Sequence, residues 1–95
     1  MVDLTEMNKL ERYLKEKGIQ YQRVDEDLGN LEIHRICVPG VTSWRWDAIC
    51  HQYSHGWEDG LIEIMGDIVP SWAGDCIEGR LTADEVIERI EERGI

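Results

Sequence analysis

The spacing of apolar residues changes twice along the chain, and this change constrains the fold more than any other feature. Near the N-terminus, apolar residues recur at steps of three and four, at Leu4, Met7, Leu10 and Leu14. The same helical spacing returns near the C-terminus, at Ala83, Val86, Ile87 and Ile90. Between these ends, apolar and polar residues alternate in short runs, as they do in half-buried strands. The sequence therefore predicts a helix at each end of a β-rich middle.

Residues with capping preferences mark the ends of both helices. Asp3 followed by Glu6 resembles a capping box, and Gly18 stands where a left-handed residue commonly ends a helix. Thr82 with Glu85 three residues later is a full capping box. We therefore expect helices over about residues 4–17 and within the segment LTADEVIERIEERG.

Three runs in the middle of the chain predict strands. Residues 19–24 and 31–38 flank the turn-forming stretch DEDLGN and indicate a hairpin. Residues 44–52 predict a third strand, antiparallel to the second. Its two faces separate Trp44, Trp46, Ala48 and Cys50 from Arg45, Asp47, Ile49 and His51. We expect the first set to face the helices and the second set to face solvent or a partner.

Residues 60–69, GLIEIMGDIV, fit a helical face slightly better than a strand, although either structure remains open. The following stretch PSWAGDCIEG is rich in turn residues and predicts an ordered loop. The expected fold class is α+β, in which one domain spans residues 1–95. An N-terminal helix and C-terminal helices pack on one face of an antiparallel sheet of three strands, or four if residues 60–69 form a strand.

The charge balance limits the partners of the protein. Twenty acidic residues against ten basic ones give a net charge of −10 and a pI near 4.6. Such a charge repels nucleic acids and anionic membranes and attracts basic protein surfaces. The alternative is that the acidity only keeps a small protein soluble. We expect a protein partner with a basic surface, such as a nucleic-acid-binding protein or nuclease, and no direct binding of nucleic acid or membrane.

The cysteines and the N-terminus predict a cytoplasmic location. Three cysteines, an odd number at unpatterned spacing, are typical of reduced thiols. The N-terminal segment lacks the apolar region of a signal peptide, and no stretch is long enough to span a membrane.

Residues 44–60, WRWDAICHQYSHGWEDG, carry most of the candidate chemistry. Cys50, His51 and His55 suggest a small metal- or thiol-dependent enzyme, but Cys50 and His51 point to opposite faces of a strand. The spacing also matches no common zinc motif, and no glycine-rich motif indicates a nucleotide cofactor. We therefore expect no catalytic residues, no metal and no cofactor, and keep the enzyme as the alternative.

The same segment is a candidate surface for binding a protein. Trp and Tyr are common at binding hot spots. Trp57 lies between glycines and acids, and Trp72 lies in a predicted loop, so these two are the candidates for exposed anchors. The expected partner-binding residues are His51, His55, Trp57, Glu58, Asp59, Glu63 and Trp72. A third hypothesis is a homodimeric accessory protein whose exposed apolar face is its dimer interface.

Three segments together resemble a group of small acidic proteins encoded by phages and mobile elements of Firmicutes. These segments are LERYLKEKGIQYQRVDED, WDAICHQYSHGWEDGLIEIMG and EGRLTADEVIERI, which cover most of the chain. Small acidic proteins of that setting include nucleic-acid mimics and inhibitors of host defence such as anti-CRISPR proteins. The resemblance thus implies a non-enzymatic inhibitor, and it implies no catalytic residues.

Overall fold

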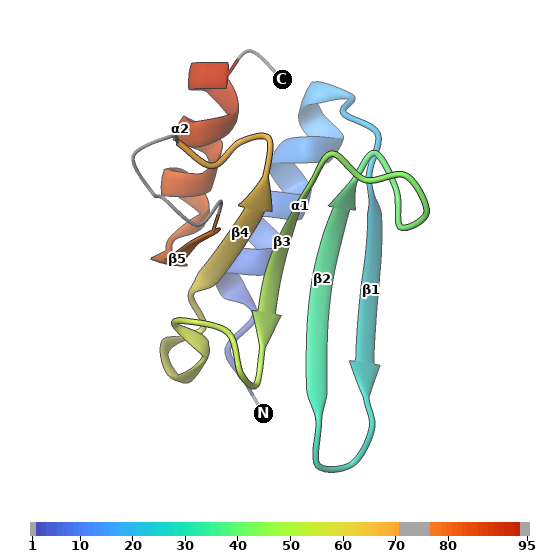
Figure 1. Ribbon diagram of the computed structural model, residues 1–95, viewed down its shortest axis with the longest axis vertical. Coiled ribbons are helices and arrows are strands. Elements are labelled where there is room, and N and C mark those ends of the chain that lie inside the picture. The colour runs from blue at the N-terminus through green and yellow to red at the C-terminus, as the bar shows by residue number, and fades with distance from the viewer. Residues whose placement is uncertain (1, 71–76, 94–95) are drawn as a thin grey trace.

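The computed structural model describes residues 2–70 and 77–93, which form an α+β fold (Figure 1). The elements in chain order are α1 (Thr5–Lys17), β1 (Gln22–Asp27), β2 (Glu32–Val38), β3 (Trp46–His51), the one-turn 3-10 helix η1 (Trp57–Asp59), β4 (Ile62–Gly66), β5 (Ile77–Leu81) and α2 (Ala83–Arg93). The helices at the two ends and the strands between them confirm the fold class predicted from the apolar spacing.

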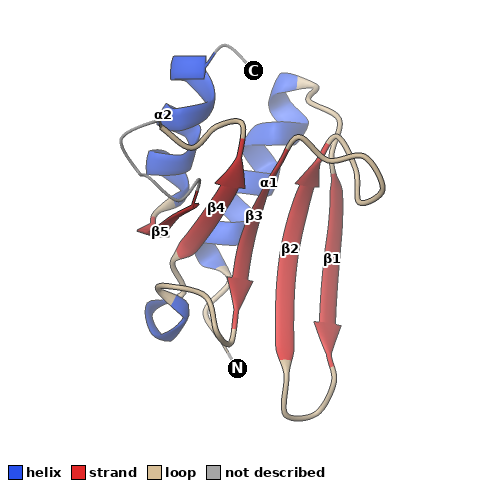
Figure 2. Ribbon diagram, viewed as in Figure 1, coloured by secondary structure: helices blue, strands red, loops and turns tan. Residues whose placement is uncertain are grey.

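The five strands form one antiparallel sheet whose spatial order is the same as their order in the chain. Both long helices lie behind the sheet in Figure 2, so that one face of the sheet is covered by helices and the other is not. The sheet therefore has five strands where the sequence predicted three or four, and a single long helix follows it. Neither long helix has the length and apolar character needed to cross a bilayer.

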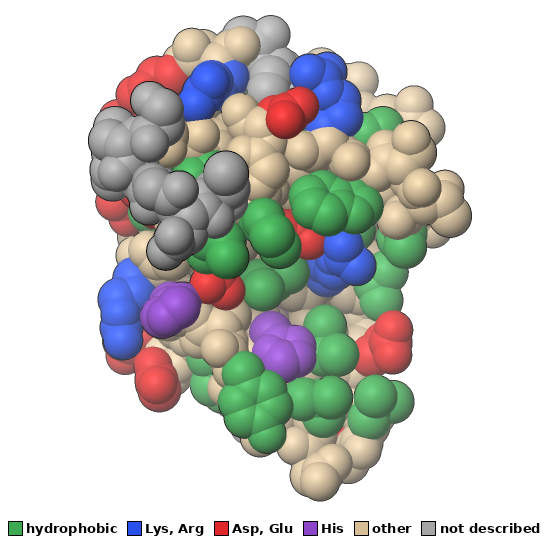
Figure 3. Space-filling model, in the orientation of Figure 1, with side chains coloured by type: hydrophobic (Ala, Val, Ile, Leu, Met, Phe, Trp, Pro, Cys, Tyr) green, Lys and Arg blue, Asp and Glu red, His purple; other side chains and the backbone are tan. Residues whose placement is uncertain are grey.

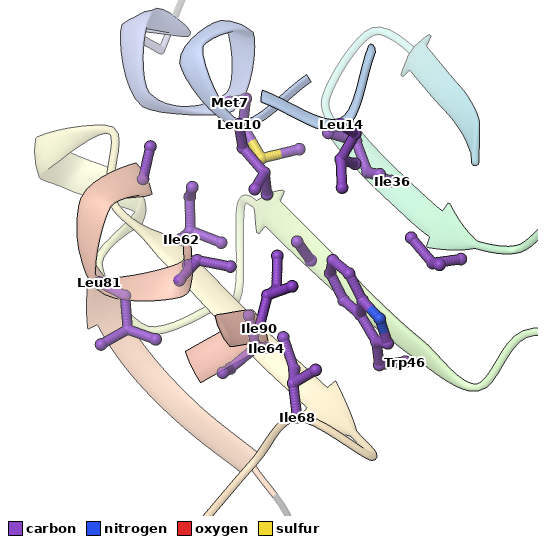
Figure 4. Packing of buried hydrophobic residues seen from close by; sticks show 14 of the residues in the cluster. Met7, Leu10, Leu14, Ile36, Trp46, Ile62, Ile64, Ile68, Leu81 and Ile90 are labelled. Carbon is purple, nitrogen blue, oxygen red and sulfur yellow. The ribbon is translucent and has the colours of Figure 1, made fainter. Parts of the chain in front are cut away.

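The core lies between the helices and the covered face of the sheet (Figure 4). Met7, Leu10 and Leu14 point from α1 toward the sheet, and each is fully buried. They meet side chains from the central strands, of which Trp46 is the largest. Because a 95-residue chain without Phe has few bulky apolar residues, one buried Trp at the centre of the sheet fills much of this core.

The N-terminus of α1 differs from the capping box expected at Asp3 and Glu6. The Asp3 carboxylate accepts hydrogen bonds from the backbone N–H and hydroxyl of Thr5, at 2.9 and 2.6 Å. Glu6 does not return to its own helix end; it accepts a 2.7 Å hydrogen bond from the backbone N–H of Ala83, at the start of α2. Gly18 ends α1 with φ of 67°, as predicted.

Strand β1 lies three residues later than predicted. Asp25, Glu26 and Asp27 continue the strand, and the turn comes only at residues 28–31, where the N–H of Leu28 donates to Leu31 over 2.7 Å. Acidic residues suit this strand because β1 is the edge of the sheet, and its side chains reach solvent.

The helix favoured for residues 60–69 is wrong, because residues 62–66 form strand β4. Ile62 and Ile64 enter the core, while Glu63 and Met65 lie on the other face. Gly60 and Gly66 bracket the strand with φ of 68° and 104°, values that interrupt a helix. A central strand with apolar residues on both faces mimics helical spacing, and this caused the error.

The end of the expected loop PSWAGDCIEG is part of strand β5, which the sequence did not indicate. Residues 71–76, including Trp72, lie outside the described residues. The capping box of α2 is confirmed: the N–H of Glu85 donates to the Thr82 hydroxyl over 3.3 Å, and the N–H of Thr82 donates to the Glu85 carboxylate over 3.0 Å.

Candidate functional site

The face of the sheet turned away from the helices, which we call the open face, is the strongest candidate site. Strand register arranges its side chains in three rows that run across the sheet. The rows are Gln22, Cys37, Asp47, Met65 and Ile77; then Val24, Arg35, Ile49 and Glu63; then Glu26, Ile33 and His51. No described helix or strand covers this face.

Apolar side chains gather on the open face (Figure 3). Ile33, Ile49 and Met65 are only partly buried although they lie on central strands. Tyr53 is 79% exposed and Trp44 is 39% exposed, in the loops that follow and precede β3. A continuous group of apolar and aromatic side chains on a surface is typical of a protein-binding site.

Trp44 is exposed, and its predicted position in the core is wrong. Strand β3 begins at Trp46, so the predicted alternation does not extend back to Trp44. Its ring lies 5.8 Å from the guanidinium carbon of Arg35 on the open face, a cation–π contact. Trp46, Ala48 and Cys50 are fully buried in the core, as predicted.

An ion pair is built into the open face beneath this tryptophan. The Nε of Arg35 donates to one carboxylate oxygen of Asp47 over 2.9 Å. Asp47 is only 2% exposed, and its second oxygen has no hydrogen-bond partner among the described residues. Burial raises the pKa of Asp47 above its ordinary value, the Glu63 charge adds to this, and Arg35 offsets only part of it.

Two histidines border the same face. His55 Nδ1 lies 2.8 Å from Glu63 Oε1, and Glu63 itself is only 8% exposed. The backbone N–H of Tyr53 donates to Nδ1 of His51 over 3.0 Å, and the two rings lie 5.6 Å apart. The structure thus places His51, His55 and Glu63 on or beside the open face, but Glu63 is a buried partner of His55 and not a free surface acid.

The turn 56–60 lies next to His55 and carries three other residues expected to bind a partner. Glu58 and Asp59 are exposed in η1. Trp57 is partly buried and packs against the core, so it is not the fully exposed anchor expected from its polar neighbours. Trp72, the remaining expected residue, lies outside the described residues.

Cys50 cannot work with the histidines named in the enzyme hypothesis. Its side chain is fully buried in the core, on the opposite face from His51, as the strand alternation predicted. Burial, together with the charges of Glu32 and Asp3, raises the pKa of Cys50 to about 11. A neutral, enclosed thiol is a poor nucleophile.

The histidine that lies opposite Cys50 in the sheet register, His34, is engaged by two acids. Its Nδ1 lies 2.7 Å from Asp25, and its Nε2 contacts Glu32. Both ring nitrogens therefore lie against carboxylates, and neither is left to act as a base for Cys50. Among residues 2–70 and 77–93, no group of three or more acidic, cysteine or histidine residues is placed to hold a metal ion.

Exposed acids concentrate away from the centre of the open face, on two elements. One is α2, whose exposed acids are Asp84, Glu85, Glu88, Glu91 and Glu92. The other is the β1–β2 hairpin, with Asp25, Glu26 and Asp27 exposed. Nearby cations are already paired, as for Arg23 with Glu11 at 2.9 Å and Arg89 with Glu78 at 2.9 Å.

The open face includes residues that the sequence analysis did not single out as a site, notably Ile33, Ile49 and Met65. The sequence did contain a signal for them. These apolar residues alternate with the core residues of the same strands, so they had to lie on the face of the sheet turned away from the core. Comparison of this chain with family models, curated proteins and solved structures finds no match.

Proposed function

We propose that this protein is a non-enzymatic interaction protein that binds another protein through its open face. The observation that carries the proposal is the group of apolar side chains, Ile33, Ile49 and Met65, which lie on central strands with no described helix or strand over them and are only partly buried. Exposed Trp44 and Tyr53 flank this group. Folding normally buries such side chains, and a partner completes that burial.

The chemistry of the partner follows from charge. With a net charge of −10, the chain attracts a surface rich in Lys and Arg at long range. Glu26 borders the apolar rows, and Glu58 and Asp59 are exposed in the adjoining turn. The partner that fits is a protein with an apolar patch surrounded by basic residues.

A basic surface with this character is common on proteins that bind nucleic acids. Following the resemblance to small acidic phage proteins, we propose that the partner is a host nuclease or another nucleic-acid-binding protein. The chain would then act as an inhibitor of the anti-CRISPR type, or as a nucleic-acid mimic, by occupying the partner's basic surface. Binding would compete with nucleic acid for that surface.

The test is capture of a partner by wild-type protein and by paired variants. Biotinylated protein is incubated with a Firmicutes lysate at about 50 mM and about 300 mM NaCl, and retained proteins are identified by mass spectrometry. Trp44→Ala with Tyr53→Ala removes the exposed aromatic residues. Leu28→Ala is the matched control, because Leu28 is 60% exposed at the hairpin tip, away from the open face. We expect one basic protein to be lost by the double variant and kept by the control.

A second pair of variants tests whether charge attracts the partner to this surface. The double variant Glu58→Lys with Asp59→Lys is compared with the double variant Glu88→Lys with Glu92→Lys on α2, and both change the net charge by the same amount. Capture should weaken more with the first pair. Equal capture by all variants at both salt concentrations would contradict the proposal, and a stable dimer in sedimentation that buries the open face would favour the homodimer.

A further inference from the structure

The two edges of the sheet differ in whether another strand can join them. At one edge, β5 pairs with β4 through an irregular register, Arg80 has φ of 60°, and its backbone N–H donates to the His55 carbonyl over 3.2 Å. At the other edge, β1 pairs with β2 over six residues without a register shift. No described residue pairs with the outer side of β1, which forms a free edge of the sheet in Figure 1.

An unpaired regular edge is a template for another strand. Its outward N–H and C=O groups can hydrogen-bond to an extended segment, which is a common mode of peptide recognition. Natural edges are often protected by bulges, prolines or charged side chains. Strand β1, QRVDED, has no bulge or proline, and its protection is the negative charge of the exposed Asp25, Glu26 and Asp27, which repels other acidic strands but not a basic one.

These acids determine which occupant fits the edge. One arginine against three acids gives the strand a formal charge of −2. Two β1 strands paired edge to edge would therefore carry a combined formal charge of −4. Like charges on neighbouring strands are destabilising, and opposite charges are favourable. A second copy is therefore disfavoured, and an extended segment that carries Lys or Arg is favoured.

Surface cavities lie at both ends of β1. One of about 350 Å³ is lined by Gln20, Tyr21, Gln22, Pro39, Gly40, Thr42 and Ser43, next to the start of the strand. Another of about 450 Å³ is lined by Asp27, Gly29, Asn30, Glu32, Gln52 and Trp57, next to its end. A strand of six residues spans roughly 20 Å, so a segment paired with β1 would reach from one cavity to the other.

The cavity beside Asp27 has the chemistry to hold a cation. Asp27 and Glu32 supply negative charge to its lining. Asp27 already accepts a 3.1 Å hydrogen bond from Gly29, and Glu32 contacts His34, yet both keep acceptor capacity because a carboxylate takes several donors. The cavity at the start of the strand is lined by neutral residues, so the preference for a basic residue belongs to the Asp27 end.

We propose that β1 accepts an extended basic segment of another protein as a sixth strand, with a Lys or Arg of that segment entering the cavity at its Asp27 end. The proposal shares with the proposed function the expectation of a basic partner, but it concerns a different surface. It adds main-chain recognition, which charge attraction alone does not provide.

The test uses a fluorescent synthetic peptide, Arg-Thr-Val-Lys-Val-Thr-Lys, with blocked ends. A fully N-methylated version keeps the side chains and charges but has no backbone N–H donors. Affinity is measured by anisotropy, and amide hydrogen exchange is measured for residues 22–27. We expect the first peptide to bind and protect these amides, and the N-methylated peptide to bind at least about tenfold more weakly.

Protein variants test whether the peptide binds at the β1 edge. Glu26→Lys with Asp27→Lys should weaken peptide binding by about tenfold or more, whereas Glu88→Lys with Glu92→Lys, an equal charge change on α2, should weaken it less than about threefold. The first pair alters exposed side chains only, and circular dichroism confirms that both variants fold.

Three results would overturn this inference. Equal binding of the N-methylated peptide, or equal weakening by both variant pairs, would show non-specific attraction of a polycation. Protection of the β1 amides in a peptide-free dimer would show that a second copy occupies the edge. Trp44→Ala with Tyr53→Ala should leave peptide binding unchanged, so failure at the edge and failure at the open face are distinguishable.

Discussion

At the scale of single residues, the contact of Asp25 with the buried His34 makes the stability of the folded chain depend on pH. Burial opposes ionisation of Asp25, but the hydrogen bond from His34 and the charge of Arg23 outweigh it and lower the Asp25 pKa below its ordinary value of 3.8. A lowered acid pKa stabilises the folded state above the ordinary value, and this contribution is lost as pH falls through the folded pKa.

Asp25→Asn tests this contribution. The variant should be less stable than wild type above about pH 5, and the difference should shrink as pH falls below the ordinary Asp value and through the lowered folded pKa, because the wild-type carboxyl then becomes neutral too. Urea denaturation across this range measures it. Glu26→Gln, the neighbouring exposed acid on the other face of β1, is the control. A difference that stays constant with pH would contradict the assignment.

The thiol of Cys50 gives a second prediction at this scale. In a Cys76→Ser background at pH 8, iodoacetamide should modify Cys50 more than about a hundredfold more slowly in the folded protein than in urea, because its pKa is near 11 and its side chain is fully buried. Peptide mapping by mass spectrometry measures both rates. Modification of folded Cys50 at the rate of an exposed thiol would restore the thiol-enzyme hypothesis.

Predictions for single residues from the sequence succeeded where strand geometry alone determines which way a side chain points. Strand alternation separated Cys50 from His51 because successive side chains point to opposite faces. It could not predict that Asp47 and Glu63 are buried, since their burial depends on neighbours brought by other strands and loops. Trp57 was misjudged for the same reason: its polar neighbours in the chain say nothing about the core that its ring meets.

At the scale of elements, Glu6 joins the two helices. It lies in the first turn of α1 but accepts the backbone N–H of Ala83, one of the unpaired donors at the start of α2. Glu6→Ala should therefore lower the free energy of unfolding by about 1 kcal/mol, as loss of a cap does. Glu16→Ala, at an exposed position of α1, should change it by less than about 0.5 kcal/mol. Equal effects in urea denaturation would argue against the cap between helices.

Gly66 ends β4 where the backbone of β3 approaches closely. Its φ is 104°, and an added Cβ would overlap the Arg45 carbonyl oxygen and the Trp46 backbone. Gly18 also has a positive φ, but an added Cβ there would meet nothing within 4 Å. Gly18→Ala should cost about 1 kcal/mol and Gly66→Ala roughly 2–4 kcal/mol, because the second adds overlap to backbone strain. Thermal denaturation of both variants measures the difference.

Elements were predictable where local signals and tertiary packing agree. Both helices combine an apolar stripe with a C-terminal glycine or a capping box, and both were found. Strand β4 was misread because a central strand buries residues on both faces, and β5 was missed because it is short and carries Gly79 and Arg80. Pairing with a neighbouring strand stabilises both, and this is not visible in a local window.

At the scale of the whole molecule, the excess of acids affects folding and binding in opposite directions. Exposed acids crowd α2 and the β1–β2 hairpin, and their mutual repulsion destabilises the folded chain at low ionic strength. The same charges attract a basic partner. Salt screens both interactions, since the Debye length falls from about 30 Å at 0.01 M to about 8 Å at 0.15 M.

The melting temperature should therefore rise by a few degrees between about 10 mM and about 300 mM NaCl, while binding of a basic partner or peptide weakens over the same range. Glu88→Lys with Glu92→Lys should raise the melting temperature at low salt and flatten its salt dependence, because it relieves repulsion on α2. Differential scanning calorimetry and anisotropy in matched buffers measure the two effects.

If salt lowered both stability and binding, the ion pairs of the folded chain, such as Arg89 with Glu78, would outweigh the repulsion. The acidic side chains would then be neutralised mainly by ion pairs within the folded chain, and they would not be free to attract a partner.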